Sequence, residues 1–307
     1  MSEPSIEVFH RSTLGNRAAT LFAATRPAFL TASLLPVLSG ITLAWGMSGQ
    51  INFGLALLTL LNIVLIHSGA NVLNDYFDAR NGTDGANTQR IFPFSGGSRF
   101  IQNGVLTQGE TLRFGLWLMG TGALLGLGFT AVSGLFILWL GLLGGLLAIF
   151  YSAPPCLACR GLGDLVIATC FGVLPVLGTV YILTGSMANE AIWAGAIIGC
   201  FVAAILWINS IPDIEADRQA GKMTLPARLG SQHAPYGLIA LFVLGFALVI
   251  VAPLSSGKYL ALLAIVPASM AIINLLRGQM MPAIPLTLAT HASVSILLMV
   301  GFLQPLL

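Results

Sequence analysis

The sequence contains little charge for its length. Asp, Glu, Lys and Arg make up 8% of its 307 residues, whereas apolar residues make up 56%. About 25% charged residues is usual in soluble domains. The mean hydropathy is +0.91 and the net charge only +2, which gives no basis for expecting a nucleic-acid partner. This composition excludes an ordinary soluble domain, so we expect lipid to surround most of the chain.

Cysteine is also scarce, and its spacing does not complete a zinc site. Of four cysteines, Cys156 and Cys159 form one Cys-x-x-Cys, without a second pair or a neighbouring histidine. Cys170 and Cys200 lie in apolar runs, where we expect small buried side chains. The first 25 residues lack the apolar core of a cleavable signal peptide, so the first spanning helix is the expected anchor.

Long apolar runs recur along the whole chain. A run of 18 or more residues can cross a hydrocarbon core of roughly 30 Å as a helix, whereas barrel strands would show alternating polarity. We therefore predict an all-α, polytopic membrane bundle of about nine transmembrane helices with cytoplasmic catalytic loops. The N-terminal cytoplasmic segment is expected over 1–26 and the transmembrane domain over 27–307. The expected spans are 27–47, 51–74, 111–132, 134–151, 164–184, 188–211, 235–254, 258–276 and 283–304.

Glycines inside the third and fourth runs suggest close packing, because a missing side chain lets two helices approach. The glycines concerned are Gly120, Gly122, Gly126, Gly128, Gly141, Gly144 and Gly145.

Positive charge is distributed unequally between the two sides of the predicted bundle. With nine spans, twelve of the thirteen Lys and Arg residues fall on one side, and Lys258 alone falls on the other. The positive-inside rule makes the first side cytoplasmic, at the inner membrane of a cell. The two long connectors, 76–110 and 212–234, lie on this side, so we expect function there.

A cluster of amides and carboxylates begins the first long connector. Asn71, Asn74, Asp75 and Asp78 recur at spacings of three and four, which places them on one face at the end of the second spanning helix. Gly82 is expected to break this helix and to let Asp84 fold back.

A second cluster begins the other long connector. Asn209, Asp213 and Asp217 are spaced by four residues, so we expect them along one face of the sixth spanning helix, with Pro212 loosening its backbone. Two acidic faces at the same end of the bundle can converge.

Carboxylates gathered at a membrane boundary repel one another and require a compensating cation. Oxygen ligands suit Mg²⁺, which commonly joins carboxylates to substrate phosphates. The predicted metal ligands are Asp75, Asp78, Asp213, Asp217, Asn71 and Asn209. A diphosphate substrate would also contact Asn74, Asp84 and the predicted cationic partners Arg90, Arg99, Arg160, Lys222 and Arg228. Tyr151, at the end of the fourth span, is a further candidate for the active site.

Simpler interpretations exist for each of these features. The clusters could be solvated helix ends, Ser95 to Arg99 a flexible turn, and Lys222 and Arg228 ordinary cytoplasmic charge. His67 and His291 lie in apolar runs, where a buried histidine bonded to a neighbour is the expected role and a proton carrier the alternative.

Together the two motifs resemble the UbiA-type intramembrane aromatic prenyltransferases. R-P-A-F-L-T-A-S-L-L-P-V-L-S-G, the Y-S-x-P-P loop with R-G-L-G-D, and A-G-K-M-T-L-P-A-R-L-G also look like family segments. N-D-Y-F-D-A-R-N-G-T-D is most similar to the branch that prenylates 1,4-dihydroxy-2-naphthoate for menaquinone. Other acceptors, of the 4-hydroxybenzoate or homogentisate type, remain alternatives.

The resemblance implies a Mg²⁺-dependent enzyme that ionises a polyprenyl diphosphate beside an electron-rich ring. It implies membrane lipid as the surrounding medium, and no obligate protein partner is expected.

Two other classes agree less well with the sequence. A secondary transporter would carry its charges at the bilayer midplane, whereas here they lie at helix ends. A phosphotransferase of the CDP-alcohol type would continue Asp84-Gly85 with a different motif from A-N-T-Q-R.

Overall fold

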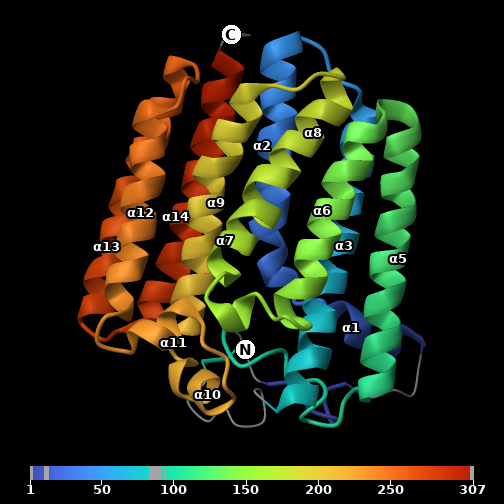
Figure 1. Cartoon of the computed structure of the whole chain (residues 1–307), viewed down its shortest axis with the longest axis vertical. Coiled ribbons are helices and arrows are strands. Elements are labelled where there is room, and N and C mark those ends of the chain that lie inside the picture. The colour runs from blue at the N-terminus through green and yellow to red at the C-terminus, as the bar shows by residue number, and fades with distance from the viewer. Residues whose placement is uncertain (1–2, 10–13, 83–90, 93, 305–307) are drawn as a thin grey trace.

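The computed structural model describes residues 3–9, 14–82, 91, 92 and 94–304, which form a bundle of long helices (Figure 1). Within these residues there is no β-strand, and nine helices are long and apolar enough to cross a membrane. The predicted all-α bundle of about nine spans is therefore confirmed.

The first four spans are Pro27–Ser48, which contains α2 (Thr31–Ser48), then α3 (Phe53–Asn81), α5 (Gln108–Ser133) and α6 (Leu135–Ser152). The fifth consists of α7 (Gly163–Ala168), a π-helical turn (Thr169–Val173) and α8 (Leu174–Thr184). The remaining spans are α9 (Asn189–Ser210), α12 (Ala234–Val251), a 3₁₀ segment (Ser256–Ala264) continued by α13 (Ile265–Leu276), and α14 (Met280–Leu303).

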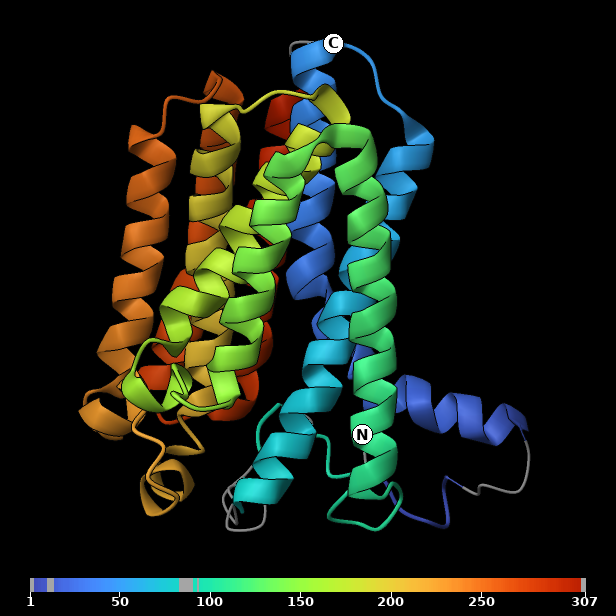
Figure 2. The ribbon, with the colours of Figure 1, turned by 45° about the vertical axis from the view of Figure 1, so that its right-hand side comes forward.

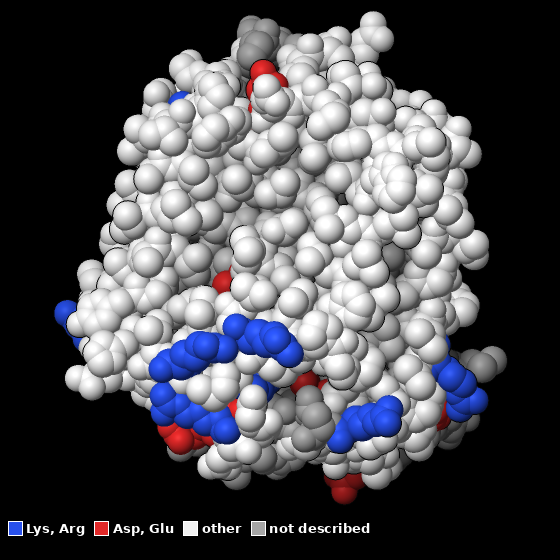
Figure 3. All heavy atoms as spheres, viewed as in Figure 1, with Lys and Arg blue, Asp and Glu red and all other residues white. Residues whose placement is uncertain are grey.

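The long connectors gather at one end of the bundle. The short helices α10 (Ile214–Gln219) and α11 (Leu225–Leu229) lie there, and the last turns of α14 lie at the opposite end (Figure 1). In the face shown in Figure 3, most of the visible Lys and Arg side chains also lie at the end that carries α10 and α11. The connectors therefore gather most of the positive charge visible on this face at one end of the bundle.

Helix α9 forms the centre of the bundle. It packs against α12, α14 and the span that contains α7 and α8, and Ile197 and Phe201 on it are fully buried. The π-helical turn approaches α9 backbone to backbone, because a methyl group on Gly172 would overlap the carbonyl oxygen of Gly195. Glycine at these positions is thus a packing requirement.

The glycines of α5 and α6 behave differently from the prediction. A methyl group on Gly120, Gly126, Gly128, Gly141 or Gly145 would meet no described atom within 4 Å. Close helix packing was therefore the wrong interpretation for these five, and only Gly122 and Gly144 have near neighbours. Several of them face a cavity instead, so the missing side chains leave space open between α5 and α6.

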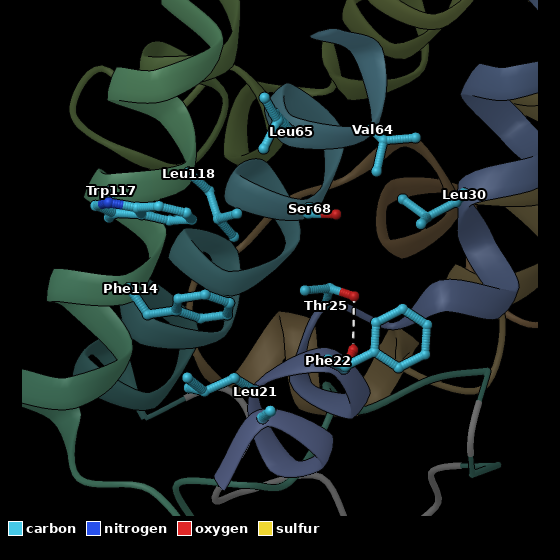
Figure 4. A pocket seen from close by; sticks show the side chains of 11 residues that line it. Leu21, Phe22, Thr25, Leu30, Val64, Leu65, Ser68, Phe114, Trp117 and Leu118 are labelled. Carbon is cyan, nitrogen blue, oxygen red and sulfur yellow. Dashed lines mark hydrogen bonds between the residues drawn. The ribbon is translucent and has the colours of Figure 1, made fainter. Parts of the chain in front are cut away.

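Helix α1 (Leu14–Ala24) runs across the end of the bundle rather than along it (blue in Figure 2). Ala24, just before the first span, belongs to an apolar cluster with Phe100, Val105 and Leu106 of the first long connector. A pocket of about 300 Å³ lies between α1, α3 and α5 (Figure 4), and none of the described side chains that line it is charged. Among the described residues, this pocket therefore offers no charged side chain to a diphosphate.

Candidate active site

A cavity of about 830 Å³ extends from the polar mouth into the bundle, between α3, α5, α6, the α7–α8 span and α9. Both predicted clusters reach its wall. The polar part is lined by Asn71, Asn74, Asp78, Asn209, Asp213, Asp217 and Lys222. Deeper in the bundle the lining is mostly apolar, with Asn62 and Thr130 among the polar exceptions, so the cavity has a charged end and a largely hydrocarbon-like end.

The first cluster lies on the last turns of α3, as predicted, and Gly82 ends the helix with φ of 83°. Asn74 Nδ2 donates a hydrogen bond of 2.9 Å to Asp78 Oδ2. Asp75 is only 6% exposed. Its Oδ1 accepts a bond of 3.2 Å from the Ser98 backbone N–H and lies 4.0 Å from Arg26 Nη1. The burial of Asp75 is thus offset by one hydrogen bond and one ion pair.

The second cluster departs from the predicted geometry. Helix α9 ends at Ser210, and Asp213 is the residue that caps the start of α10. A single helix through Asn209, Asp213 and Asp217 was wrong, because Pro212 has no N–H to continue the helical hydrogen bonds. The turn redirects the chain into α10, on which Asp217 is buried and lines the cavity.

Lys222 joins the two clusters. Its Nζ lies 3.9 Å from Asp78 Oδ2 and 3.8 Å from Asp217 Oδ1. Burial acts to lower the pKa of the Lys222 ammonium, but the carboxylates of Asp78 and Asp217 outweigh this effect and raise its pKa above the ordinary value. Burial raises the pKa of the Asp217 carboxyl to about 6, although Lys222 acts in the opposite direction. Lys222 is therefore a fixed positive charge between two acidic helix ends.

The donor set around this lysine fits Mg²⁺. Asn209 Oδ1 is buried in the cavity wall and has no hydrogen-bond partner among the described residues. In that part of the chain, no three His, Cys, Asp or Glu side chains come close enough to enclose an ion by themselves. Mg²⁺ usually keeps several waters and takes one or two carboxylates together with phosphate oxygens. The arrangement suits an ion held jointly by the protein and a phosphorylated ligand.

The other predicted site residues differ in whether they line the cavity. Tyr151 lines the cavity within electrostatic range of Lys222. Arg99, with φ of 68°, directly follows Ser98 in the connector. The exposed side chains of Arg160 and Arg228 donate to the carbonyls of Pro155 and Met223, and neither side chain is part of the cavity lining that the structure describes. Asp84 and Arg90 lie outside the described residues.

Sequence reasoning missed three contributors. Arg26 lines the cavity and pairs with Asp75, but in the sequence it counted only as cytoplasmic charge. Asp164, in R-G-L-G-D, lines the cavity, and its Oδ1 has no partner among the described residues; an acidic residue at the start of an apolar run was the available signal. The Ser98 contact has no such signal, because every non-proline residue carries a backbone N–H.

Cys156 and Cys159 are joined by a disulfide in the connector after α6. They contribute no thiol to the cavity.

Comparison with known proteins gives a consistent result. The sequence model of the UbiA prenyltransferase family matches residues 33–280. The 1,4-dihydroxy-2-naphthoate octaprenyltransferase of Haemophilus influenzae is 35% identical over 216 residues, which cover 67% of this chain and 68% of the relative. The Bacillus subtilis protein of the same name is 28% identical over 292 residues, with 92% of each chain covered.

Solved structures show the same fold. The apo structure of a UbiA homolog from Aeropyrum pernix K1 superposes with a TM-score of 0.67 at 21% identity, covering 89% of this chain and 98% of that one. A UbiA homolog from Archaeoglobus fulgidus bound to GPP and Mg²⁺ superposes with a TM-score of 0.62 at 16% identity, covering 93% and 99%.

Proposed function

The chain belongs to the UbiA prenyltransferase family, and from this premise we propose that it transfers a polyprenyl group from its diphosphate to 1,4-dihydroxy-2-naphthoate. Relatives that bear the name of this activity cover up to 92% of the chain. The proposed acceptor is an electron-rich ring with two hydroxyls and one carboxylate. The proposed donor is an amphiphile with a charged head and a long apolar tail.

One observation carries the proposal. Lys222 lies between Asp78 and Asp217 at the charged end of a cavity whose other end is mostly apolar. A prenyl diphosphate has the same two-part character, because its head requires cations and its tail favours a dry environment. We assign the head to the mouth and the tail to the space between α5 and α6.

The residues around the head divide into two kinds. Asp75, Asp78, Asp213 and Asp217, with Asn71 and Asn209, are the oxygen donors that would hold Mg²⁺. When bound, Mg²⁺ supplies Lewis-acid stabilisation of the leaving diphosphate. Lys222 and Arg26 are fixed positive charges that offset the negative charge developing as the carbon–oxygen bond breaks.

The apolar lining has its own role in this scheme. An allylic cation reacts with water, so the transfer requires a site from which water is excluded. The apolar side chains of α3, α5 and α6 that line the deep cavity supply such surroundings. The acceptor ring would lie between the head site and this apolar part.

We place this multi-pass protein in the inner membrane of the cell, with the charged mouth facing the cytoplasm. The support is the gathering of Lys and Arg at the end that carries α10 and α11 (Figure 3), together with the positive-inside rule. A cytoplasmic mouth gives a water-soluble aromatic acid and a diphosphate direct access.

The test is a reconstituted assay. Purified protein in lipid nanodiscs receives Mg²⁺, a polyprenyl diphosphate and, in separate reactions, 1,4-dihydroxy-2-naphthoate, 4-hydroxybenzoate or homogentisate. Diphosphate release and the mass of the prenylated product are measured. We expect product with the naphthoate and far less with the others. Product with another acceptor alone would correct the acceptor, and no product with any of them would overturn the proposal.

A further inference from the structure

His67 lies in the wall of the active-site cavity, deeper than the acidic residues of α3. It precedes Asn71 by one turn and Asp75 by two, which corresponds to about 6 and 12 Å along the helix axis. The side chain is 5% exposed and lines the cavity. It therefore occupies the transition between the charged mouth and the apolar interior.

The hydrogen bonds around His67 determine which ring nitrogen carries the hydrogen. Ser33 Oγ lies 2.7 Å from His67 Nδ1 and 3.1 Å from the Leu30 carbonyl oxygen. A hydroxyl has one hydrogen, and a carbonyl can only accept. Both bonds are made only if the hydroxyl donates to Leu30 and Nδ1–H donates to the hydroxyl. This leaves Nε2 as the nitrogen with a free lone pair.

Nε2 has no protein partner in the described part of the chain. Among the described residues, the His67 ring makes one hydrogen bond, the one to Ser33. Nε2 is not one of the polar atoms that are both completely enclosed and without a partner, so it keeps some accessible surface. Since the residue lines the cavity, an acceptor nitrogen is available to a ligand.

The surroundings of His67 suit a flat aromatic ligand. Phe171 stands edge-on to the imidazole, with ring centroids 4.6 Å apart, and Phe29 and Arg26 line the same cavity. Phe171 lies in the π-helical turn Thr169–Val173, a distortion that frequently occurs at functional sites. The Phe171 ring beside the imidazole thus provides an aromatic surface on which a planar ligand ring can pack.

We propose that His67 binds the aromatic acceptor, with Nε2 accepting a hydrogen bond from one ring hydroxyl and Ser33 holding the imidazole in the required tautomer. This inference rests on the proposed function. The hydrogen bond orients the ring and strengthens as positive charge develops on the hydroxyl oxygen during attack, so it stabilises the transition state.

The experiment compares acceptors with and without the donating hydrogen. Wild type and His67→Leu are each assayed with 1,4-dihydroxy-2-naphthoate and with its two monomethyl ethers. For the ether at the bonded hydroxyl, wild type should lose about tenfold in kcat/KM relative to the parent acceptor, the size expected for one neutral hydrogen bond. In His67→Leu, the ratio of kcat/KM for this ether to kcat/KM for the parent acceptor should approach the ratio measured with the other ether. KM for the polyprenyl diphosphate should stay unchanged.

Three further variants complete the test. His67→Gln, which retains an acceptor atom, should recover part of the discrimination. His291→Leu is the matched control, because His291 is also buried but does not line the described cavity, and it should discriminate as wild type does. If His67→Leu does not purify as a folded protein, His67→Met replaces it as the apolar variant in the same comparison. The flexible methionine side chain can fill the same space.

The outcomes separate the two hypotheses. Equal discrimination in wild type and in the apolar His67 variants would overturn the role of His67 while leaving the proposed function intact. No product from wild type with any acceptor would overturn the proposed function, and the role of His67 with it.

Discussion

Lys222 lies 3.9 Å from Asp78, although the two residues belong to motifs in opposite halves of the chain. The same ammonium lies 3.8 Å from Asp217. It therefore holds the end of α3 and the start of α10 together across the mouth of the cavity. In the proposed function, a diphosphate at this mouth would meet a positive charge that two carboxylates hold in place. Such preorganisation is the main source of electrostatic stabilisation in enzymes.

Replacing Lys222 by Met should lower kcat at least about 100-fold, because loss of one fixed charge at developing negative charge commonly costs this much. The prenyl-transfer assay measures the effect. Arg277→Met removes an exposed positive charge beyond the end of α13 and should leave kcat unchanged. Near-normal turnover of Lys222→Met would show that the bridge is only structural.

Asp75→Asn and Asp213→Asn should each reduce turnover about 100-fold or more, because each keeps the size of the side chain but removes a charge that would hold the metal. Glu215→Gln is the control, since Glu215 lies on α10 with a side chain 56% exposed and pairs with Arg218. Retention of near-normal activity by either aspartate variant, in protein with a wild-type elution profile, would contradict the two-cluster clamp.

Chelation by EDTA should abolish diphosphate release, and added Mg²⁺ should restore it. The physical reason is that four carboxylates and a diphosphate together carry more negative charge than Lys222 and Arg26 can offset. Activity that persists after exhaustive chelation would remove the metal from the proposed function.

Gly126→Leu and Gly141→Phe should shorten the longest prenyl chain that the protein accepts. Both glycines line the apolar cavity, and neither has a described atom within 4 Å of an added methyl group, so a larger side chain fills the space without displacing a neighbour. Product lengths from a series of prenyl diphosphates provide the measurement. Gly120→Leu, on α5 but not in the described cavity lining, should leave the product lengths unchanged. An unchanged limit in all three variants would place the tail elsewhere.

Gly172→Ala should destabilise the bundle by about 1–3 kcal/mol, the usual cost of overpacking. The added methyl group would overlap the backbone of α9 at Gly195 and Gly199. Gly178→Ala, in the same span, is the matched control, because its methyl group would meet only Leu140 Cδ1 at 3.8 Å. Thermal unfolding in detergent should show a lower midpoint for Gly172→Ala alone, and equal midpoints would contradict the close approach at the π-helical turn.

The features predicted correctly depend on neighbours in the chain. The length and hydropathy of each run determine a spanning helix, because lipid offers no other partner for the backbone N–H and C=O groups. Spacings of three and four place Asn74 beside Asp78 for the same local reason. The prediction that the second cluster lies on one continuous helix was wrong because it gave the i, i+4 spacing more weight than Pro212. The missing N–H of Pro212 ends α9.

Contacts between distant segments could not be predicted in this way. Arg26, Arg160, Lys222 and Arg228 are equivalent in a positive-inside count, yet only Arg26 and Lys222 line the described cavity. The glycines of α5 and α6 are likewise ambiguous, because a missing side chain permits either a close helix contact or an open space. The structure places Gly122 against Ile66 and leaves Gly126 and Gly141 facing the cavity.

The sequence by itself determined that this is a multi-pass helical membrane protein with two acidic motifs at one end, because hydropathy and helical periodicity act over a few turns of chain. Only the tertiary structure decided that Lys222 bridges the motifs, that Arg26 pairs with Asp75, and that His67 lines the cavity with its Nδ1 bonded to Ser33. These relationships follow from the relative placement of whole helices, which is set by packing among α2, α3, α9 and their neighbours and not by any one segment.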